Sequence, residues 1–370
     1  MWRMRQFTIM IKPASSLCNL RCRYCFYADV SSRRETAYYG QMSISVARKM
    51  IKNIFCDLKP FDRVTFAFQG GEPMLAGLDF FSEFCRMAEA ARKNIEISYT
   101  IQTNGILMDE NWCRFFKEKN FLVGLSLDGP EDFHDQNRID ERGEGTYQKV
   151  LHAKEMLEFY QVDYNILTVL TNELAKYPEE CWENAQNLKL SYIQYVPCLE
   201  DLGSEIAHPY TLTPQRFASF YIRLFELWDR DRRKGKIISV KLFDDILNLL
   251  IFHICTACGI TGKCSPQLVV ESDGSVYPCD FYVLDQHKVG MFTEQTLEEL
   301  LLSPAMKTFL QMPRETLSLC TQCRYRYLCG GGCKRMQPEV CGTFHDLFCG
   351  YKMFLDAVWD KLISITHELH

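Results

Sequence analysis

The chain has 370 residues, of which 47% are hydrophobic, and a formal net charge of −5. The length allows one large domain or two to three ordinary ones, and the charge excludes the basic face of a non-specific nucleic-acid binder. No apolar run of roughly eighteen residues occurs, so we expect no membrane span. The N-terminus has no long apolar region or cleavage site of a signal peptide, so we expect a cytoplasmic protein.

The eighteen cysteines are the unusual feature of the composition. Without an export signal, we interpret them as thiolate ligands in a reducing compartment rather than as disulfides. They are concentrated at 18–25 and at 255–349. The scattered ones are expected to be small buried apolar residues: Cys56, Cys85, Cys113, Cys181 and Cys198.

From residue 7 to about 200, strand-like and helix-like segments alternate. The predicted strands are Phe7–Ile11, Val64–Phe68, Ile95–Gln102, Leu122–Leu127, Asp163–Leu170 and Leu190–Val196. The predicted helices are Ser43–Phe55, Leu78–Lys93, Asp109–Glu118, Thr146–Tyr160 and Tyr177–Asn187, with Ser43 and Asp109 as N-caps. Consecutive β/α units imply parallel strands with right-handed crossovers, and hence an open or closed α/β barrel.

Three cysteines, Cys18, Cys22 and Cys25, follow the first predicted strand. They therefore fall at the carboxyl end of the strands, where such folds bind ligands. Three thiolates hold three irons of a four-iron cluster and leave one iron open for chemistry. A structural zinc site is closed by four protein ligands, yet no Cys or His follows within fifteen residues of Cys25.

Other loops at predicted strand ends are polar or rich in glycine. They are Gln69–Pro73, Thr103–Gly105, Ser126–Pro130 and Cys198–Glu200. Any one of them is compatible with an ordinary turn. Several on the same rim as a three-cysteine loop favour a binding site.

After residue 200 the pattern becomes helical and then rich in cysteine. Pro214–Arg233 predicts an amphipathic helix whose aromatic stripe belongs to the core. Lys241–Ile254 and Tyr351–His367 predict two further helices. The change in character near 235–250 predicts domains at 1–235 and 236–349, followed by a C-terminal helix at 350–370.

The C-terminal cysteines form a second pattern. Cys264 and Cys279 flank a predicted hairpin with Asp273-Gly274 as its turn. Cys320, Cys323, Cys329 and Cys333 follow in a C-x2-C-x5-C-x3-C run, and Cys349 comes sixteen residues later. With Cys255, Cys258 and Cys341 the region holds ten cysteines, whereas two complete four-cysteine sites need eight, so two are spare. Zinc and iron–sulfur clusters both accept four thiolates, and the open site upstream favours iron.

Asp280 directly follows Cys279. A carboxylate covalently adjacent to a cluster ligand is held near that cluster, where it could act as a general base. The alternative is a surface or turn aspartate without a chemical role.

These motifs carry a family resemblance. The Cys18–Cys25 pattern, with Tyr24 before the third cysteine, resembles the radical S-adenosylmethionine superfamily, and Gly70–Pro73 resembles its motif for the methionine amino group. The later spacings resemble the SPASM extension with two auxiliary four-iron clusters. Over nearly its whole length the chain resembles the anaerobic sulfatase-maturating enzymes, above all in Val269–Tyr282. The resemblance implies a partial (β/α)6 barrel followed by a cysteine-rich SPASM domain.

The resemblance also implies S-adenosyl-L-methionine (AdoMet) and three [4Fe-4S] clusters as cofactors. The ligand sets it implies are Cys18, Cys22 and Cys25 for the catalytic cluster, Cys258, Cys264, Cys279 and Cys333 for the first auxiliary cluster, and Cys320, Cys323, Cys329 and Cys349 for the second. The AdoMet contacts it implies are Tyr24, Gly71, Ser126, Arg138 and Leu199, with Arg138 suited to a carboxylate. Asp280 matches the family's proposed base. Cys255 and Cys341 have no partner in the pattern, and Cys255 could replace Cys258.

The implied reaction oxidises a cysteine or serine of a sulfatase peptide to formylglycine. A 5′-deoxyadenosyl radical takes a hydrogen from the β-carbon, Asp280 takes the thiol or hydroxyl proton, and an auxiliary cluster accepts the second electron. Tyr27 and Gln69 would line the cleft or simply pack. The implied partners are an unfolded sulfatase polypeptide with a Cys/Ser-x-Pro/Ala-x-Arg motif and reduced flavodoxin or ferredoxin as electron donor, and neither nucleic acid nor membrane is expected.

Two rival interpretations remain at this stage. A SPASM enzyme that crosslinks another peptide often carries an extra N-terminal recognition domain, and the seventeen residues before Cys18 leave no room for one. A zinc-stabilised binding or scaffold protein would use the cysteines structurally. Metal analysis separates the second rival from the enzyme.

Overall fold

The computed structural model describes residues 4–204, 207–313, 316–343 and 346–369. The chain forms two compact units. The first comprises the residues up to Ser126, Arg138–Tyr164 and Pro266–Met312, and the second comprises Leu127–Asn137, Asn165–Ser265 and the chain from Pro313. The division does not follow the predicted boundaries at 235 and 349, which remain a prediction. No helix among the described residues has both the length and the apolar character to cross a bilayer.

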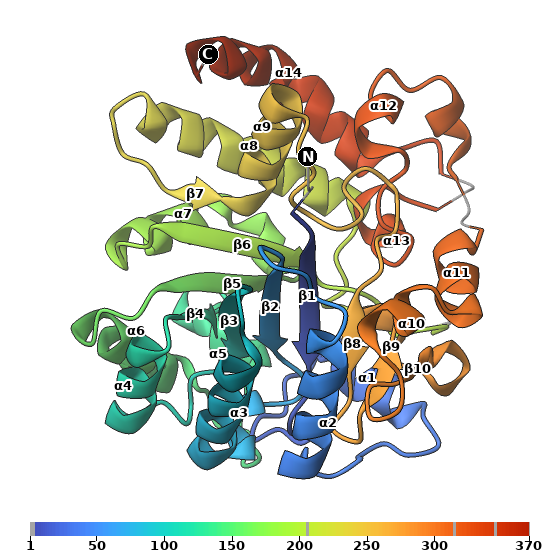
Figure 1. The fold of residues 1–370 in the computed structure, drawn as a ribbon. Helices are drawn as coiled ribbons and strands as arrows, with labels where there is room; N and C mark the ends of the chain where they lie inside the picture. Colours follow the sequence, from blue (N-terminus) through green and yellow to red (C-terminus); the bar gives the residue numbers. More distant parts are fainter. Residues whose placement is uncertain (1–3, 205–206, 314–315, 344–345, 370) are drawn as a thin grey trace. The chain divides into compact units, whose positions relative to one another are not determined.

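The first unit is built on a sheet with the strand order β10-β9-β8-β1-β2-β3-β4 (Figure 1). Its strands are β1 (Gln6–Ile11), β2 (Arg63–Phe68), β3 (Glu96–Thr103), β4 (Phe121–Ser126), β8 (Leu268–Val270), β9 (Ser275–Tyr277) and β10 (Gly290–Met291). Strands β1 to β4 pair in parallel. The carboxyl ends of these strands therefore share one edge of the sheet, as the sequence predicted.

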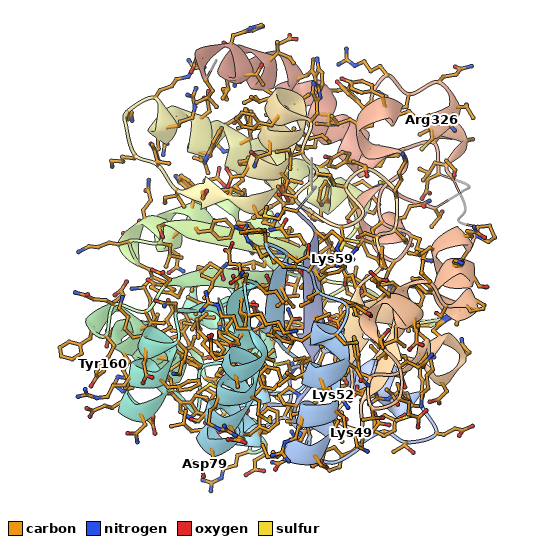
Figure 2. The ribbon with its side chains drawn as sticks, in the orientation of Figure 1. Lys49, Lys52, Lys59, Asp79, Tyr160 and Arg326 are labelled. Carbon is orange, nitrogen blue, oxygen red and sulfur yellow. The ribbon has the colours of Figure 1, made fainter. Side chains whose placement is uncertain are left out.

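Helices connect these strands. They are α1 (Phe26–Ser32), α2 (Ile44–Phe55), η1 (Pro73–Ala76), α3 (Leu78–Ala91), α4 (Glu110–Glu118), α6 (Tyr147–Phe159), η3 (Asp280–Tyr282), η4 (Asp285–His287), α10 (Leu297–Leu301) and α11 (Pro304–Gln311). Both predicted N-caps are confirmed, since Ser43 accepts a hydrogen bond from Val46 N and Asp109 accepts one from Trp112 N. On α2, Lys49 and Lys52 occupy the exposed face (Figure 2).

Aromatic side chains fill the core between the sheet and α3. Phe68 on β2 packs against Phe81 on α3 with ring centroids 4.8 Å apart, and Phe66 meets Phe84 at 5.1 Å. All four rings are fully buried. A packed aromatic core fixes the strands whose ends carry the polar loops.

The second unit combines the parallel strands β5, β6 and β7 with long helices. Its elements are α5 (Glu131–Asn137), β5 (Tyr164–Leu170), η2 (Leu174–Lys176), α7 (Pro178–Asn187), β6 (Tyr192–Pro197), α8 (Pro214–Arg232), β7 (Ser239–Val240), α9 (Lys241–Phe252), η5 (Ser318–Thr321), α12 (Arg326–Cys329), α13 (Gln337–Val340) and α14 (Gly350–Leu369). Helix α8 packs against α14. The aromatic stripe of α8 is buried, with Tyr221 and Phe354 rings 5.9 Å apart, so its prediction as core is confirmed.

The predicted strands and long helices all agree with the structure to within about two residues at each end. The predicted hairpin is also present, with β8 and β9 antiparallel and Gly274 at a positive φ of 91° in the turn. One feature of the hairpin was not predicted, namely that β8 also pairs in parallel with β1. The hairpin thereby brings Cys279 and Asp280 into the first unit.

None of the eighteen cysteines, all of which lie in the described part of the chain, forms a disulfide. Of the scattered cysteines, Cys85, Cys113, Cys181 and Cys198 are buried as predicted. The prediction is wrong for Cys56, which is exposed at the C-terminal end of α2.

Candidate functional site

The three-cysteine loop begins just after β1 and ends in α1. Cys25 is the N-cap of α1, and its N–H donates to Cys22 O at 3.2 Å. Cys18 Sγ accepts a hydrogen bond from Leu20 N at 3.4 Å. Burial, and to a lesser extent Glu72 and Cys25, raises the pKa of the Cys18 thiol to about 11. Such a thiol is protonated at neutral pH unless a metal takes the place of its proton. Three thiols on one loop are the donor set of a four-iron cluster with one open iron.

The glycine-rich loop after β2 is fastened to this cysteine loop by its backbone. Gly71 N donates to Ser15 O at 2.9 Å, and Glu72 N donates to Leu17 O at 2.8 Å. A Cβ on Gly71 would lie 2.1 Å from Leu17 O. The second glycine is therefore needed for the close approach of two backbones.

Glu72, in the same glycine-rich loop, accepts several hydrogen bonds. Its side chain is 1% exposed. It accepts hydrogen bonds from Met74 N at 3.0 Å, Thr103 Oγ1 at 2.8 Å and Asn104 N at 2.8 Å. Asn104 in turn donates to Asn19 Oδ1 at 2.8 Å. One buried carboxyl group thus joins the ends of β2 and β3 to the cysteine loop.

Burial also makes the stability of the fold depend on pH, because it raises the pKa of the Glu72 carboxyl group from 4.5 to about 7. At pH values between these two, the folded chain keeps a proton that the unfolded chain has released. The free energy of unfolding therefore falls as pH rises through this range. Glu72→Gln is expected to remove this slope, a difference of about 1 kcal/mol in unfolding free energy between pH 6 and pH 8. Anaerobic urea unfolding of both proteins at the two pH values measures it, and equal slopes would contradict the prediction.

The predicted AdoMet contacts lie in both units. Tyr24, Gly71, Ser126 and Arg138 belong to the first unit and Leu199 to the second. The Arg138 guanidinium lies 5.7 Å from the Tyr24 ring centroid. The Arg138 segment is also tied to the cysteine loop, because Arg21 N donates to Ile139 O at 2.7 Å. A buried guanidinium beside the cysteine loop suits a carboxylate ligand.

Ser126 is the last residue of β4, and Leu199 lies two residues beyond the end of β6. Ser126 Oγ accepts a hydrogen bond from Gln102 Nε2 at 3.1 Å, and its side chain is buried. Leu199 is buried in the loop that follows β6. Both side chains stand at the carboxyl ends of their strands, as the sequence predicted.

Asp280 is neither a surface nor a simple turn residue. It begins η3 and is 15% exposed, and its Oδ1 lies 2.6 Å from Lys12 Nζ. Lys12, which follows β1, is itself 1% exposed. Two rings join Asp280 to the cysteine loop, since Phe26 beside Cys25 packs edge-on against Phe281 at 5.2 Å. The carboxylate is therefore held next to the three-cysteine loop by an ion pair and an aromatic contact.

A second buried network supports Lys12. Its Nζ lies 3.7 Å from the Tyr27 ring centroid, within cation–π range. The Tyr27 hydroxyl donates to Glu271, which forms an ion pair with Arg34 at 2.6 Å. Arg34 and Glu271 are both fully buried. Tyr27, predicted as a possible cleft residue, is itself 2% exposed and serves this network.

The cysteines predicted for the first auxiliary cluster lie in both units. Cys279 belongs to the first unit, and Cys258, Cys264 and Cys333 belong to the second. Burial raises the pKa of Cys333, and the nearby Cys258 and Cys264 thiols raise it further. The Cys258 and Cys333 segments touch, since a Cβ on Gly259 would lie 2.7 Å from Cys333 Cβ. Within the second unit, Cys258, Cys264 and Cys333 are therefore neighbours.

The cysteines predicted for the second auxiliary cluster surround one cavity of the second unit. Its empty space, about 370 Å³, includes some that is open to solvent, and its lining residues include Arg326 on α12. Figure 2 labels this arginine. The thiols around it are those of Cys320, Cys323, Cys329, Cys341 and Cys349. Cys341, which had no partner in the sequence pattern, is therefore at this site. Cys255 is exposed, and its Sγ donates to Ala257 O at 3.2 Å.

Sequence reasoning missed the roles of Lys12, Glu72 and the Arg34–Glu271 pair. One signal was available for Lys12 and Glu271, because each is a charged residue at the end of an apolar β-rich run. Charged side chains are seldom fully buried without a partner, so such positions indicate paired sites. Their partners could not be read from the sequence.

Comparison with known proteins fits this geometry. The model of the radical SAM superfamily matches residues 13–181, and the model of SPASM, an iron–sulfur cluster-binding domain, matches residues 262–324. The fold is accordingly a radical SAM domain followed by a SPASM domain, as predicted. Three proteins illustrate the similarity over most or all of the chain.

A cysteine-type anaerobic sulfatase-maturating enzyme of Clostridium novyi (strain NT) is 39% identical over 371 residues, covering 99% of both chains. A serine-type anaerobic sulfatase-maturating enzyme of Klebsiella aerogenes is 29% identical over 92% of this chain and 84% of its own. The solved structure of native anSMEcpe with bound AdoMet and the Cp18Cys peptide has a TM-score of 0.91 and 36% identity, covering 99% of this chain and 100% of that one. This chain thus belongs to the family of anaerobic sulfatase-maturating enzymes, within the radical S-adenosylmethionine superfamily.

Proposed function

We propose that this protein oxidises a cysteine or serine side chain of a sulfatase polypeptide to formylglycine. The observation that carries the proposal is the Asp280 carboxylate, held by the buried Lys12 and joined to the three-cysteine loop through Phe26 and Phe281. A general base must lie within reach of the reacting group, and this position supplies one. The similarity to enzymes named for sulfatase maturation, over 99% of this chain for one and 92% for another, supports it.

The residues that would hold the cofactors are those of the predicted ligand sets. Cys18, Cys22 and Cys25 would hold the catalytic cluster, with Tyr24, Gly71, Ser126, Arg138 and Leu199 around AdoMet. The four-cysteine set that includes Cys279 would hold the first auxiliary cluster. The set that includes Cys349 would hold the second. When bound, AdoMet and its cluster supply hydrogen abstraction, and the auxiliary clusters supply electron acceptance.

The protein's own residues perform the remaining tasks. Arg138 pairs with the carboxylate of the methionine moiety and fixes its orientation. Asp280 accepts the thiol or hydroxyl proton of the target residue on its carboxylate as the C=S or C=O double bond forms. A serine target then already holds the aldehyde, whereas for a cysteine target water replaces the sulfur, which leaves as sulfide. Lys12 Nζ, at 2.6 Å, holds that carboxylate in place, and Tyr27 packs against the same ammonium. This arrangement preorganises the base before the peptide binds.

The same proposal names the substrate of the enzyme and its electron donor. The target is a peptide with a Cys/Ser-x-Pro/Ala-x-Arg motif, and reduced flavodoxin or ferredoxin is the electron donor. Cysteine is the favoured target, because the cysteine-type relative is 39% identical and the serine-type relative 29%. The absence of disulfides among all eighteen cysteines suits a reducing cytoplasm.

The test is anaerobic incubation of the reconstituted protein with AdoMet, a reductant and either of two peptides. One peptide carries Cys-x-Pro-x-Arg, and the other carries serine in place of cysteine. Mass spectrometry should show conversion to the aldehyde, with the cysteine peptide the better substrate. A crosslinked or unchanged peptide alongside AdoMet cleavage would refute sulfatase maturation and favour another peptide-modifying activity.

Lys12→Met is expected to slow peptide oxidation roughly tenfold to a hundredfold, because a displaced base loses its reactive geometry. AdoMet cleavage should persist, so the ratio of formylglycine to 5′-deoxyadenosine falls. Lys12→Arg keeps the charge and should restore part of that ratio. A merely structural role for Lys12 would lower both products together, and that result would contradict the prediction.

A further inference from the structure

The cavity of the second unit is surrounded by one thiol more than a four-iron cluster uses. Such a cluster takes four cysteine ligands. The five cysteines that line this cavity are Cys320, Cys323, Cys329, Cys341 and Cys349. The sequence pattern had assigned four of them and left out Cys341.

Cys341 differs from the isolated cysteines of the core. It is 3% exposed and forms the C-cap of α13, where its N–H donates to Gln337 O at 2.8 Å. It lines the cavity beside Cys349. Cys320 and Cys329 line the same cavity. Cys341 is thus one of a group of thiols around a common space.

The backbone holds Cys341 and Cys349 together. Gly350 N donates to Cys341 O at 3.3 Å, so the start of α14 is fastened to the end of α13. Cys349 Sγ accepts a hydrogen bond from Lys352 N at 3.4 Å. Gly332 borders the Cys341 thiol, since a Cβ there would be in van der Waals contact with Cys341 Sγ at 3.4 Å. Either thiol can therefore reach the cavity without moving the backbone.

We infer that Cys341 is a reserve ligand of the second auxiliary cluster, able to replace Cys349 on the same iron. The inference rests on the cluster assignment of the proposed function. In the exchange, the Cys341 thiol gives up its proton, its sulfur bonds to iron and the Cys349–iron bond breaks. The departing Cys349 thiolate takes the proton, so no oxidant or reductant is needed.

The test uses the full chain, reconstituted anaerobically with iron and sulfide, and measures iron per chain and the electron paramagnetic resonance spectrum of the reduced protein. The wild type is expected to hold about twelve irons, from three four-iron clusters. Cys341→Ala and Cys349→Ala should each also hold about twelve, the latter with an altered spectrum. The double variant should fall to about eight.

Two matched control variants show how much iron is lost when a ligand is removed and when a cysteine outside the site is removed. Cys323→Ala removes a ligand with no spare thiol assigned to it and should hold about eight irons, while the exposed Cys56→Ala should match the wild type. If the alanine chain fails to accumulate, Cys349→Val, whose side chain also cannot bind iron, carries the same expectation. If Cys349→Ala or Cys349→Val loses as much iron as Cys323→Ala, or if Cys341→Ala alone does so, the reserve role is overturned. A wild type with fewer than three clusters would instead contradict the cluster assignment itself.

Discussion

Asp280→Asn is expected to lower peptide oxidation roughly a hundredfold to ten-thousandfold, the usual contribution of a positioned general base. The asparagine side chain has the same shape but cannot accept the proton as a carboxylate does. It also presents an amide to Lys12 Nζ, which in the wild type lies 2.6 Å from Asp280 Oδ1. Mass spectrometry of the peptide gives formylglycine, and chromatography of the same samples gives 5′-deoxyadenosine.

The matched control is Asp285→Asn, five residues further along the same segment. Asp285 is exposed, and its carboxylate accepts a hydrogen bond from Glu35 N at 2.8 Å. Turnover by this variant should equal that of the wild type. Full turnover by Asp280→Asn would show that the base lies elsewhere.

The double variant Lys12→Met/Asp280→Asn separates two accounts of Lys12. If Lys12 acts through Asp280 alone, the double variant should be no slower than Asp280→Asn, since residues in contact couple and their effects do not add. If Lys12 also contacts the substrate, the two losses should multiply. The first result is expected, because Lys12 is 1% exposed and Asp280 is 15% exposed.

Features of the fold that depend on neighbouring residues could be predicted from the sequence. The capping residues Ser43 and Asp109 and the turn at Asp273-Gly274 act within a few residues, so their effects can be read from the sequence. The pairing of β8 with β1 could not be predicted, because it joins Ile9 to Leu268 across most of the chain. Periodicity identifies a strand but not its neighbour.

The candidate site also has parts that the sequence predicts and parts that only the fold reveals. The cysteine spacings and the Asp280 position were visible because chemistry fixes residue type at short range. The Glu271–Arg34 and Lys12–Asp280 pairs join residues more than two hundred positions apart, and only the fold brings them together. Cys341 was left without a role because spacing patterns record sequence distance, whereas a ligand set depends on which thiols share a space.

Gly71→Ala is expected to remove most activity, at least a hundredfold, by displacing the three-cysteine loop. The new Cβ would lie 2.1 Å from Leu17 O and 2.9 Å from Ser16 C, and both are backbone atoms that no rotamer change can move. Relieving the overlap breaks the hydrogen bonds from Gly71 N to Ser15 O and from Glu72 N to Leu17 O. The loop that carries Cys18 then shifts as a whole.

Gly77→Ala is the control that isolates this contact. Gly77 lies six residues further on at a φ of 84°, and a Cβ there meets nothing within 4 Å. Its ψ of 151° places it in a region of backbone space nearly confined to glycine, so Gly77→Ala carries backbone strain alone, roughly 1–3 kcal/mol. The variant should keep its iron and its AdoMet binding. Gly71→Ala should lose both, measured as iron per chain and by equilibrium dialysis of labelled AdoMet. Equal retention by the two variants would mean that the cysteine loop tolerates displacement and that the tight backbone contact is not what positions it.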